Sequence, residues 1–555
     1  MQNTNDVSRR AFLKCAGAAG AATAITAGVA GTALAEEAAA DWMPESWDME
    51  CDVLVIGYGG AGLWASLTAC DEGGAEVLVL EKAPVRGGGN SSINMGEFTW
   101  VDDVEKGVSY IEAFTKGYTS EDMARAWCEE AYMNLDYCDY WGVEAMVKSG
   151  TNASRGTASC EYPTFEGADA MHVCSVGDNG NGFWQQLDAI RADLGIEVVF
   201  GCHDEKLIQN PSTKEILGAY TLIGDDETPK AVKARKGVIM SCGGFEFNEQ
   251  MQADHLRCYP LRGMYGWPYN TGDGFDMVTR VGAKLVNMNN AIGNANAYLA
   301  DSGYPYAFQL TPGTKNFVYL DRTGKRWRAE STGFNPHLGW HEFTKMNDGE
   351  MCDFERIPTW VILDKNALSN GPIGLPKGGV MSNPAFSTSI GMALEDVPAE
   401  VGGNEGWSED NSYEIENGWI KSGDTLEELI GKLDEETRPD LETALASIAQ
   451  YNAYCEAGED PDFGRTPETL LPVAEPPFYA YPIYPGGCTT LGGPDKNVNA
   501  QVLDVDGNVI PRLYAAGSFG NFQRHTYGIS GGGNGENMVW GRIAGRHAAS
   551  LESWE

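Results

Sequence analysis

The sequence predicts an α/β fold joined to a second domain of short strands and turns. Three observations lead to this prediction. A strand, a glycine-rich turn, a helix and a second strand follow one another over residues 52–81. Further strands, at 196–200, 219–223 and 237–241, follow a long helical region. After about residue 290 the chain changes to short aromatic strands and turns. Strands that alternate with helices are typical of a parallel sheet covered by helices.

The glycine-rich turn is Gly57-x-Gly59-x-x-Gly62, between an apolar strand at 53–56 and a helix expected from about residue 61 to residue 72. Gly57 allows the tight turn, Gly59 lets the backbone approach a pyrophosphate, and Gly62 lets helix and strand pack closely. The partial positive charge at the helix N-terminus favours phosphate groups.

The second strand, residues 77–80, ends in Glu81, at the spacing from Gly62 that is typical of this fingerprint. A carboxylate at this point can accept hydrogen bonds from ribose hydroxyls. The glycine run Gly87-Gly88-Gly89 follows shortly afterwards, and its backbone N–H groups can surround a bulkier part of the same ligand. Together these features predict a dinucleotide site.

At this point the chain resembles the FAD-dependent fumarate reductase / 3-ketosteroid dehydrogenase family. Six segments carry the resemblance in the family's order: Gly87 to Ser92, Ala234 to Phe245, Asn270 to Gly274, Gly324 to Glu330, Leu513 to Gly517, and Gly531 to Gly545. The resemblance covers most of residues 50–550. It implies a Rossmann-like FAD-binding domain, similar to that of glutathione reductase, with an inserted α+β cap domain.

The resemblance also divides the chain. Residues 49–290 are the expected first part of the FAD-binding domain, 291–476 the cap and substrate domain, and 477–555 the return to the FAD-binding domain. The helices expected in 425–457 belong to the outer side of the cap. The fingerprint and the resemblance together predict these FAD contacts: Gly57, Gly59, Gly60, Ala61, Gly62, Glu81, Lys82, Gly88, Gly89, Asn90, Ser91, Gly243, Gly244, Asp273, Gly517, Asn534, Asn537 and Met538.

We expect the FAD to be non-covalent, because the 86–96 loop, where related enzymes attach it, has no histidine. A helix is expected from about Asn537 to Leu551, directly after the glycine run that begins at Gly531. Its N-terminus can direct partial positive charge at the pyrimidine edge of the flavin and so raise the flavin's reduction potential.

Tyr527 and Gly531 match the tyrosine and glycine that hold the substrate ketone in ketosteroid dehydrogenases. A phenol O–H and a backbone N–H aimed at one carbonyl oxygen form an oxyanion hole, which stabilises the enolate formed when hydride is added next to the carbonyl. Tyr484-Pro485-Gly486 resembles the same branch of the family.

Several positions depart from both branches. Cys488 and Thr489 stand where fumarate reductases have two histidines, and Gly333 stands where their arginine relay continues. The strand that begins at Trp360 lacks their proton-donating arginine, and Phe334 replaces the tyrosine base of ketosteroid dehydrogenases. Neither dicarboxylate reduction nor standard steroid 1-dehydrogenation is therefore expected. The candidates for moving the proton or assisting catalysis are Glu330, Tyr118, His525, His337, His341 and Arg328.

The prediction is an FAD-dependent enzyme that transfers hydride between flavin N5 and a C–C bond conjugated to a carbonyl, as an enone or acrylate-type reductase in anaerobic respiration. The substrate is expected to be small and apolar. Two alternatives stay open: a fumarate- or urocanate-type carboxylate reductase, and a flavin electron-transfer subunit without its own substrate site. The chain has no Cys-x-x-Cys-His haem motif. Electrons are therefore expected from an external donor: a cytochrome, a quinol-linked protein or a flavin carrier.

The N-terminal Ser8-Arg9-Arg10-Ala11-Phe12-Leu13-Lys14 is a twin-arginine motif, followed by an Ala/Gly-rich stretch and the small-x-small site Ala33-Leu34-Ala35. Residues 1–35 are thus predicted to be a signal peptide for the twin-arginine export machinery, which places the mature enzyme in the periplasm, the cell envelope or outside the cell. The net charge of −40 disfavours nucleic acid as a partner. The scattered cysteines show no metal-site spacing, so no metal is expected, and most should be small buried groups.

Overall fold

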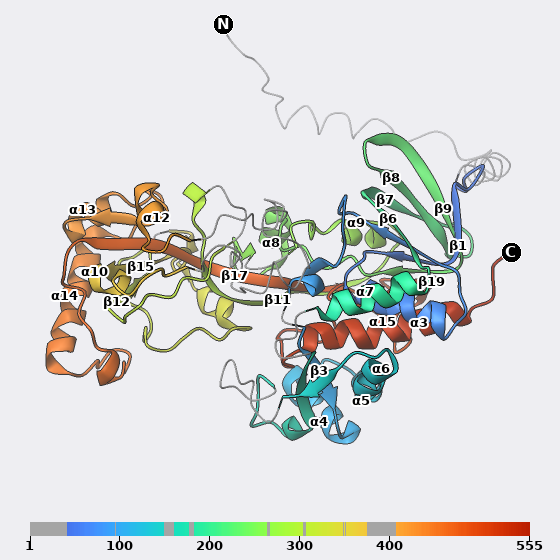
Figure 1. The fold of residues 1–555 in the computed structure, drawn as a ribbon, viewed down its shortest axis with the longest axis horizontal. Helices are drawn as coiled ribbons and strands as arrows, with labels where there is room; N and C mark the ends of the chain where they lie inside the picture. The colour runs from blue at the N-terminus through green and yellow to red at the C-terminus, as the bar shows by residue number, and fades with distance from the viewer. Residues whose placement is uncertain are drawn as a thin grey trace, which may run out of the picture.

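The computed structural model describes residues 42–94, 96–148, 160–176, 182–263, 267–302, 307–347, 349, 351–374 and 407–555. The predicted signal peptide lies outside these residues. The described chain forms two lobes along the long axis of the molecule, joined by the long strands β11 (Leu285–Ala297) and β17 (Phe478–Pro494) (Figure 1).

The larger lobe is built on one sheet with the strand order β18-β19-β9-β1-β2-β6. The strands from β19 to β6 are all parallel, and β18 and the β7–β8 hairpin add antiparallel edges. Their bounds are β1 (Met49–Ile56), β2 (Val77–Glu81), β6 (Glu197–Phe200), β7 (Cys202–Gln209), β8 (Ile216–Ile223), β9 (Asp226–Met240), β18 (Gln501–Leu503) and β19 (Val509–Ala515). This parallel sheet confirms the predicted α/β fold.

Helices α3 (Gly60–Asp71), α7 (Phe183–Asp193) and α15 (Gly532–Ser550) lie beside this sheet (Figure 1). α15 lies against α3 at two glycines. A Cβ at Gly541 would lie 2.8 Å from the carbonyl oxygen of Ala61, and one at Gly545 would lie 2.4 Å from that of Ala65. Because the two helices approach closely, α15 lies next to the glycine-rich turn of residues 57–62, called the nucleotide turn below. α15 begins at Gly532, five residues before the predicted start, because the glycine run is itself helical.

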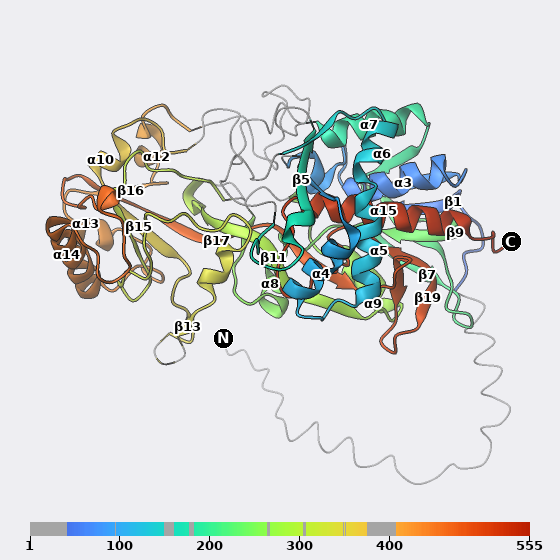
Figure 2. The ribbon, with the colours of Figure 1, turned by 90° about the horizontal axis from the view of Figure 1, so that it is seen from below.

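A small antiparallel sheet and three helices lie below α15 in Figure 1, and Figure 2 shows them from below. The sheet order is β3-β5-β4. The bounds are β3 (Phe98–Val101), α4 (Val104–Thr115), α5 (Glu121–Tyr132), α6 (Asn134–Tyr140), β4 (Ala145–Val147) and β5 (Met171–Val176). The long helical region predicted before the strand at 196–200 also contains a strand, β4, because Ala145 to Val147 pairs with β5.

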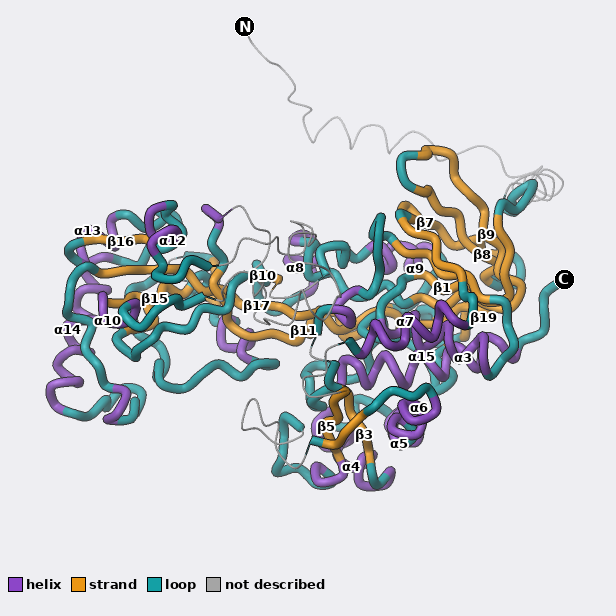
Figure 3. Tube along the Cα trace, viewed as in Figure 1, coloured by secondary structure: helices purple, strands orange, loops and turns teal. Residues whose placement is uncertain are grey.

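The second lobe is built on a six-stranded sheet in which β17 pairs with four strands, β10, β11, β15 and β16. Apart from β11, β17 and α14, its elements are short, and Figure 3 shows them joined by loops. The bounds are β10 (Arg262–Gly263), β12 (Phe317–Leu320), β13 (Met346–Asn347), β14 (Asp353–Phe354), β15 (Thr359–Asp364), α10 (Lys365–Leu368), α12 (Ser412–Glu416), β16 (Lys421–Gly423), α13 (Leu426–Gly431) and α14 (Leu441–Ala457).

Two helices lie toward the junction of the lobes, α8 (Glu249–His255) and α9 (Asp273–Arg280) (Figure 1). The short 3₁₀ segments are Gly89–Ser92, Ala168–Ala170, Ala300–Ser302, Gly339–Phe343 and Pro467–Thr469. The predicted domain boundary at residue 290 falls inside β11, and the predicted return at residue 477 lies directly before β17. Among the described helices none is long and apolar enough to cross a bilayer.

The twelve described cysteines are free thiols, and eight of them are buried. Burial raises the pKa of Cys51 and of Cys258 to about 12, although the nearby Arg235 and Arg257, respectively, oppose the shift. Most of the thiols therefore act as small buried apolar groups, as the sequence predicts.

Candidate active site

A cavity of about 600 Å³ lies where the parallel strands of the large sheet end and the second lobe begins. The carboxyl ends of parallel strands are the usual ligand site of such sheets. Most of the sequence-predicted site residues line it: Gly57, Gly59, Gly60, Ala61, Glu81, Lys82, Gly89, Asn90, Ser91, Gly243, Asp273, Gly517, Tyr527, Gly531, Asn534 and Asn537.

The turn from β1 to α3 has the geometry that its glycines predict. Gly57 has φ of +100°, and a Cβ there would lie 2.5 Å from the carbonyl oxygen of Ser241. A Cβ at Gly62 would lie 2.0 Å from the carbonyl oxygen of Gly57. A Cβ at Gly59 would meet only the carbonyl oxygen of Gly88, at 3.9 Å, so the backbone here faces open space. α3 has no acidic residue in its first turn, and its N-terminus can therefore face a phosphate.

Glu81, at the end of β2, is buried and held in place by backbone groups. The N–H of Tyr58 donates to it at 2.8 Å and the N–H of Ala83 at 2.9 Å. Burial raises the pKa of Glu81, although these two N–H groups oppose the shift. The next residue, Lys82, forms an ion pair with Asp273 at the start of α9. The predicted ribose-binding acid thus occupies a fixed position at the cavity wall.

Glu246 is a buried carboxylate that sequence reasoning missed, and it joins four segments around the cavity. It accepts hydrogen bonds from Asn90 Nδ2 at 2.9 Å, from Asn270 Nδ2 at 2.7 Å and from the Thr490 N–H at 3.2 Å. Asn90 in turn accepts from the N–H of Trp267 at 2.5 Å. Its position directly after the Gly243-Gly244-Phe245 turn was the only available signal.

Tyr527 and Gly531 lie together at the start of α15. The Tyr527 hydroxyl accepts a hydrogen bond from the N–H of Gly533 at 3.3 Å, and its ring is 3% exposed. Gly531 has φ of +72°, and a Cβ there would lie 2.8 Å from the carbonyl carbon of Phe98, so only glycine fits. Both residues line the cavity, as a ketone-binding pair requires.

His337 and Glu161 also meet at this part of the cavity. His337 Nδ1 and Glu161 Oε1 are 2.5 Å apart, although the residues are 176 positions apart in the chain. Glu161 lies against the Tyr527 segment because its N–H donates to the carbonyl oxygen of Gly528 at 3.1 Å. Glu161 was not predicted, since no motif surrounds it.

Four predicted FAD contacts lie behind the cavity wall rather than on it: Gly62, Gly88, Gly244 and Met538. Gly62 packs on Gly57, the N–H of Gly88 donates to the carbonyl oxygen of Tyr58 at 2.8 Å, and a Cβ at Gly244 would lie 2.3 Å from Thr490 Oγ1. Met538, on α15, is fully buried in the hydrophobic core of the larger lobe. These residues shape the wall through packing.

Tyr118 and His525 differ from their predicted place at the site, because neither lines the cavity. Tyr118 is 72% exposed, since α4 ends at Thr115 and leaves it in a surface turn. Its ring lies edge-on to that of His525, with 6.2 Å between the centroids. Burial lowers the pKa of His525, and the nearby Arg257 and Lys116 lower it further.

Glu330 also differs from the predicted catalytic role, because it lies in the core of the second lobe. Arg326 donates to both of its oxygens, at 2.8 and 2.7 Å, and Arg465 donates at 3.3 Å. Arg326 also donates to Asp460 at 2.9 Å. All four side chains are at most 5% exposed. Glu330 is thus fully committed to this ion-pair cluster.

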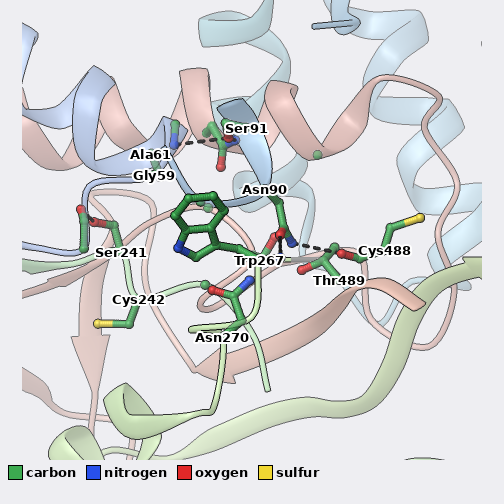
Figure 4. A pocket seen from close by; sticks show the side chains of 18 of the residues that line it. Gly59, Ala61, Asn90, Ser91, Ser241, Cys242, Trp267, Asn270, Cys488 and Thr489 are labelled. Atoms are coloured by element: carbon green, nitrogen blue, oxygen red, sulfur yellow. Dashed lines mark hydrogen bonds between the residues drawn. The ribbon is translucent and has the colours of Figure 1, made fainter. Parts of the chain in front are cut away.

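The residues present fit FAD. Glycine backbone and a helix N-terminus face a phosphate position, and Glu81 faces a ribose position. Trp267 lies across the cavity between the Gly59–Ala61 turn and Asn270 (Figure 4). Its Nε1 is buried and has no hydrogen-bond partner among the described residues, so it offers a donor to a ligand. No arginine is among the described residues that line the cavity.

Glu246→Gln is expected to weaken FAD binding roughly 10- to 150-fold. The substitution removes the charge that organises Asn90 and Asn270, and hydrogen bonds to a charged group are worth about 1.5–3 kcal/mol. Titration of apoprotein with FAD, followed by flavin fluorescence, measures the affinity.

The control is Glu414→Gln, a buried carboxylate of the second lobe that accepts from the Ser408 N–H at 2.7 Å. It should lower stability and leave the affinity for FAD unchanged. Equal FAD affinity in the Glu246 variant and the wild type would contradict the organising role of Glu246.

Comparisons with known proteins agree with this geometry. The model of the FAD binding domain family matches residues 52–534. A digoxin reductase of Eggerthella lenta is 28% identical over 582 residues, covering 94% of this chain and 91% of that protein. A 3-oxosteroid 1-dehydrogenase of Mycobacterium tuberculosis is 28% identical over 598 residues, covering 90% and 98% respectively.

Among solved structures, the fold is similar to that of a 3-ketosteroid delta1-dehydrogenase from Sterolibacterium denitrificans, solved with 1,4-androstadiene-3,17-dione. The TM-score is 0.68 at 20% identity, and the match covers 90% of this chain and 99% of that one. This likeness shows a shared fold.

Proposed function

Because this chain belongs to the FAD binding domain family, we propose that it is an oxidoreductase that reduces a C=C bond conjugated to a carbonyl group. The enzyme is an FAD-dependent oxidoreductase that acts on CH–CH groups. The finer proposal is an enone or acrylate-type reductase with a small, apolar, carbonyl-containing substrate.

The observation that carries the proposal is the place of Tyr527 and Gly531 on the wall of the cavity that also holds the nucleotide turn. The Tyr527 hydroxyl accepts from the Gly533 N–H, which polarises its own O–H and strengthens it as a donor to a substrate oxygen. The oxygen of a carbonyl held in this way gains negative charge when hydride is added to the β-carbon. The Tyr527 O–H and the Gly531 N–H would stabilise that charge.

FAD, bound without a covalent link, would supply the hydride and its two electrons. The chain's own groups would bind and polarise the substrate. The two 28% identical relatives are named a digoxin reductase and a 3-oxosteroid 1-dehydrogenase. The electrons would come from an external donor, a cytochrome, a quinol-linked protein or a flavin carrier. Export by the twin-arginine route, to the periplasm or the cell envelope, is proposed from Arg9 and Arg10.

Two observations weigh against the alternatives. A carboxylate reductase needs arginines around an anionic substrate, and none is among the described lining residues. An electron-transfer subunit needs no substrate space. Here the second lobe contributes Gln309, Phe334, Pro336 and His337 to the cavity wall.

The test is anaerobic reoxidation of the reduced, FAD-loaded enzyme by 2-cyclohexen-1-one, acrylate, fumarate and urocanate, followed by flavin absorbance. Rapid reoxidation by the cyclic enone, well above that by fumarate or urocanate, is the expected result. Reoxidation by fumarate or urocanate alone would move the assignment to the carboxylate-reducing branch. A flavin reoxidised by none of the four, but rapidly by a one-electron acceptor such as ferricyanide, would favour the electron-transfer subunit.

A further inference from the structure

We propose that His337, oriented by Glu161, is the acid that gives the proton to the α-carbon of the substrate. This inference rests on the proposed function and supplies the group that sequence reasoning left unassigned. His337 is the catalytic residue of the pair, because it lines the cavity. Glu161 is a positioning residue, because it acts through His337.

Glu161 is held by three hydrogen-bonding side chains from two segments. His337 Nδ1 lies 2.5 Å from its Oε1, the Ser530 hydroxyl donates to the same oxygen at 3.0 Å, and Asn335 Nδ2 donates to Oε2 at 3.3 Å. The Glu161 side chain is 6% exposed. Burial alone raises the pKa of Glu161, but the bonds from His337, Asn335 and Ser530 outweigh it and leave the pKa below its usual value. Glu161 is therefore an ionised anchor.

The backbone fixes His337 from the other side. Its N–H donates to Asn335 Oδ1 at 2.8 Å, and its carbonyl oxygen accepts from the N–H of Gly293 in β11 at 2.9 Å. Its ring is edge-on to that of Tyr527, with centroids 5.0 Å apart and an interplanar angle of 71°. Because Glu161 engages Nδ1, proton transfer to substrate falls to Nε2. The carbonyl-polarising hydroxyl and the acid are thus neighbours on one wall.

Apart from its tyrosines and cysteines, the other titratable groups on the wall have partners of their own or lie on other segments. Glu97 is paired with Lys148 at 2.6 Å, and Lys82 is paired with Asp273. Glu81 is held by two backbone N–H groups. Glu205 lies near Asp273 and Lys82, and burial raises its pKa to about 7. Glu205 lies on β7 beside Lys82 and Asp273, and not on the segment that carries Tyr527.

The other candidates from the sequence do not reach the wall. His337 is the one histidine among the described residues that line the cavity. His341 does not line it, and burial, with Arg257 and His525 nearby, lowers the pKa of His341 to about 4. Arg328 donates to the carbonyl oxygens of Thr332 and Gly333.

The step balances with the substrate and His337 alone once hydride has reached the β-carbon. The C=C electron pair of the resulting enolate forms a new C–H bond at the α-carbon. The proton comes from Nε2–H of the imidazolium, whose N–H bond breaks and leaves neutral imidazole. The carbonyl C=O is restored, and its oxygen stays hydrogen-bonded to Tyr527. In the reverse direction neutral His337 removes the α-proton of a saturated ketone.

The test compares His337→Gln and Glu161→Gln with His172→Gln. His172 is a matched control, because its Nε2 lies 2.7 Å from Asp102 on the β3–β5 sheet and it does not line the cavity. In the FAD-loaded enzyme, 2-cyclohexen-1-one reduction should fall about 10²- to 10⁴-fold in His337→Gln. It should fall about 10- to 100-fold in Glu161→Gln, by analogy with the loss of a carboxylate that orients a metal-bound histidine. The control should keep the wild-type rate.

Two further readouts do not depend on turnover. Exchange of the α-protons of cyclohexanone into D₂O, followed by NMR with the oxidised enzyme, should be lost in His337→Gln and retained in His172→Gln. The chain has seven histidines, so the ¹⁵N signals of the His337 ring are assigned by their loss in His337→Gln. Those signals should shift in Glu161→Gln, because the ring loses the carboxylate that fixes its Nδ1–H.

The outcomes separate the two proposals. A wild-type enzyme that neither reduces the enone nor exchanges the ketone protons overturns the proposed function, and this inference with it. A wild-type enzyme that reduces the enone, beside a His337→Gln variant with full rate and full exchange, overturns the role of His337 alone. Should His337→Gln lose FAD or fold poorly, His337→Asn gives the same comparison. Unchanged ring signals in Glu161→Gln overturn the positioning role.

Discussion

Tyr527→Phe is expected to lower the rate of enone reduction by about 10²- to 10³-fold, the usual effect of removing one donor from an oxyanion hole. The ring stays in place against His337, so the substitution removes only the hydroxyl that accepts from the Gly533 N–H. FAD affinity should change little, because Tyr527 is not among the predicted FAD contacts and the nucleotide turn at Gly57 to Gly62 is left intact. Single-turnover reoxidation of the reduced enzyme by 2-cyclohexen-1-one measures the effect.

Tyr110→Phe is the matched control. Tyr110 is a fully buried phenol whose hydroxyl donates to the carbonyl oxygen of Gly528 at 2.6 Å, one residue from Tyr527, and it does not line the cavity. This variant should lose stability and keep its rate per folded molecule. Equal rates in Tyr527→Phe and the wild type would mean that the substrate carbonyl is held elsewhere.

Glu330→Gln is expected to destabilise the protein by about 3–5 kcal/mol, the range for removing one partner of a buried ion pair. The loss leaves Arg326 and Arg465 buried with less compensating charge. Enone reduction per folded molecule should not change, because Glu330 does not line the cavity. Urea unfolding, together with the rate measured on the folded fraction, separates the two effects.

Glu121→Gln serves as the comparison, since Glu121 forms a surface ion pair with Arg125 at 3.1 Å and its side chain is 63% exposed. Such a pair is worth about 0–1 kcal/mol. If Glu330→Gln kept its stability and instead lost its rate, the catalytic role predicted from the sequence would be restored.

The nucleotide part of the site could be predicted because its functional residues are close together in the sequence. Gly57, Gly59 and Gly62 act within one strand–turn–helix unit, and Glu81 ends the next strand, so their positions follow from local geometry. Tyr527 and Gly531 were predicted from the resemblance to ketosteroid dehydrogenases, and both line the cavity.

The rest of the site could not be predicted, because it depends on pairings between distant segments. Glu161 and Glu246 stand in no motif, and each gains its role only when the fold brings it to His337 or to Asn90 and Asn270. Glu330 shows the converse: its segment matched a family motif, but Arg465, a partner 135 residues away, draws it into the core of the second lobe.

The long strand β17 links the sheet of the second lobe to the wall of the cavity. Residues 478–483 of the strand pair with β15 and β16, whereas residues 483–494 pair with β11 beside the cavity. One continuous strand therefore belongs both to the sheet of the second lobe and to the wall of the cavity. The ladder between β11 and β17 is interrupted between Val286 and Asn290 and between Ile292 and Gly293. Gly293 is also the residue whose N–H donates to the carbonyl oxygen of His337. The same strand that pairs within the second lobe thus also pairs with β11, which holds the backbone of His337.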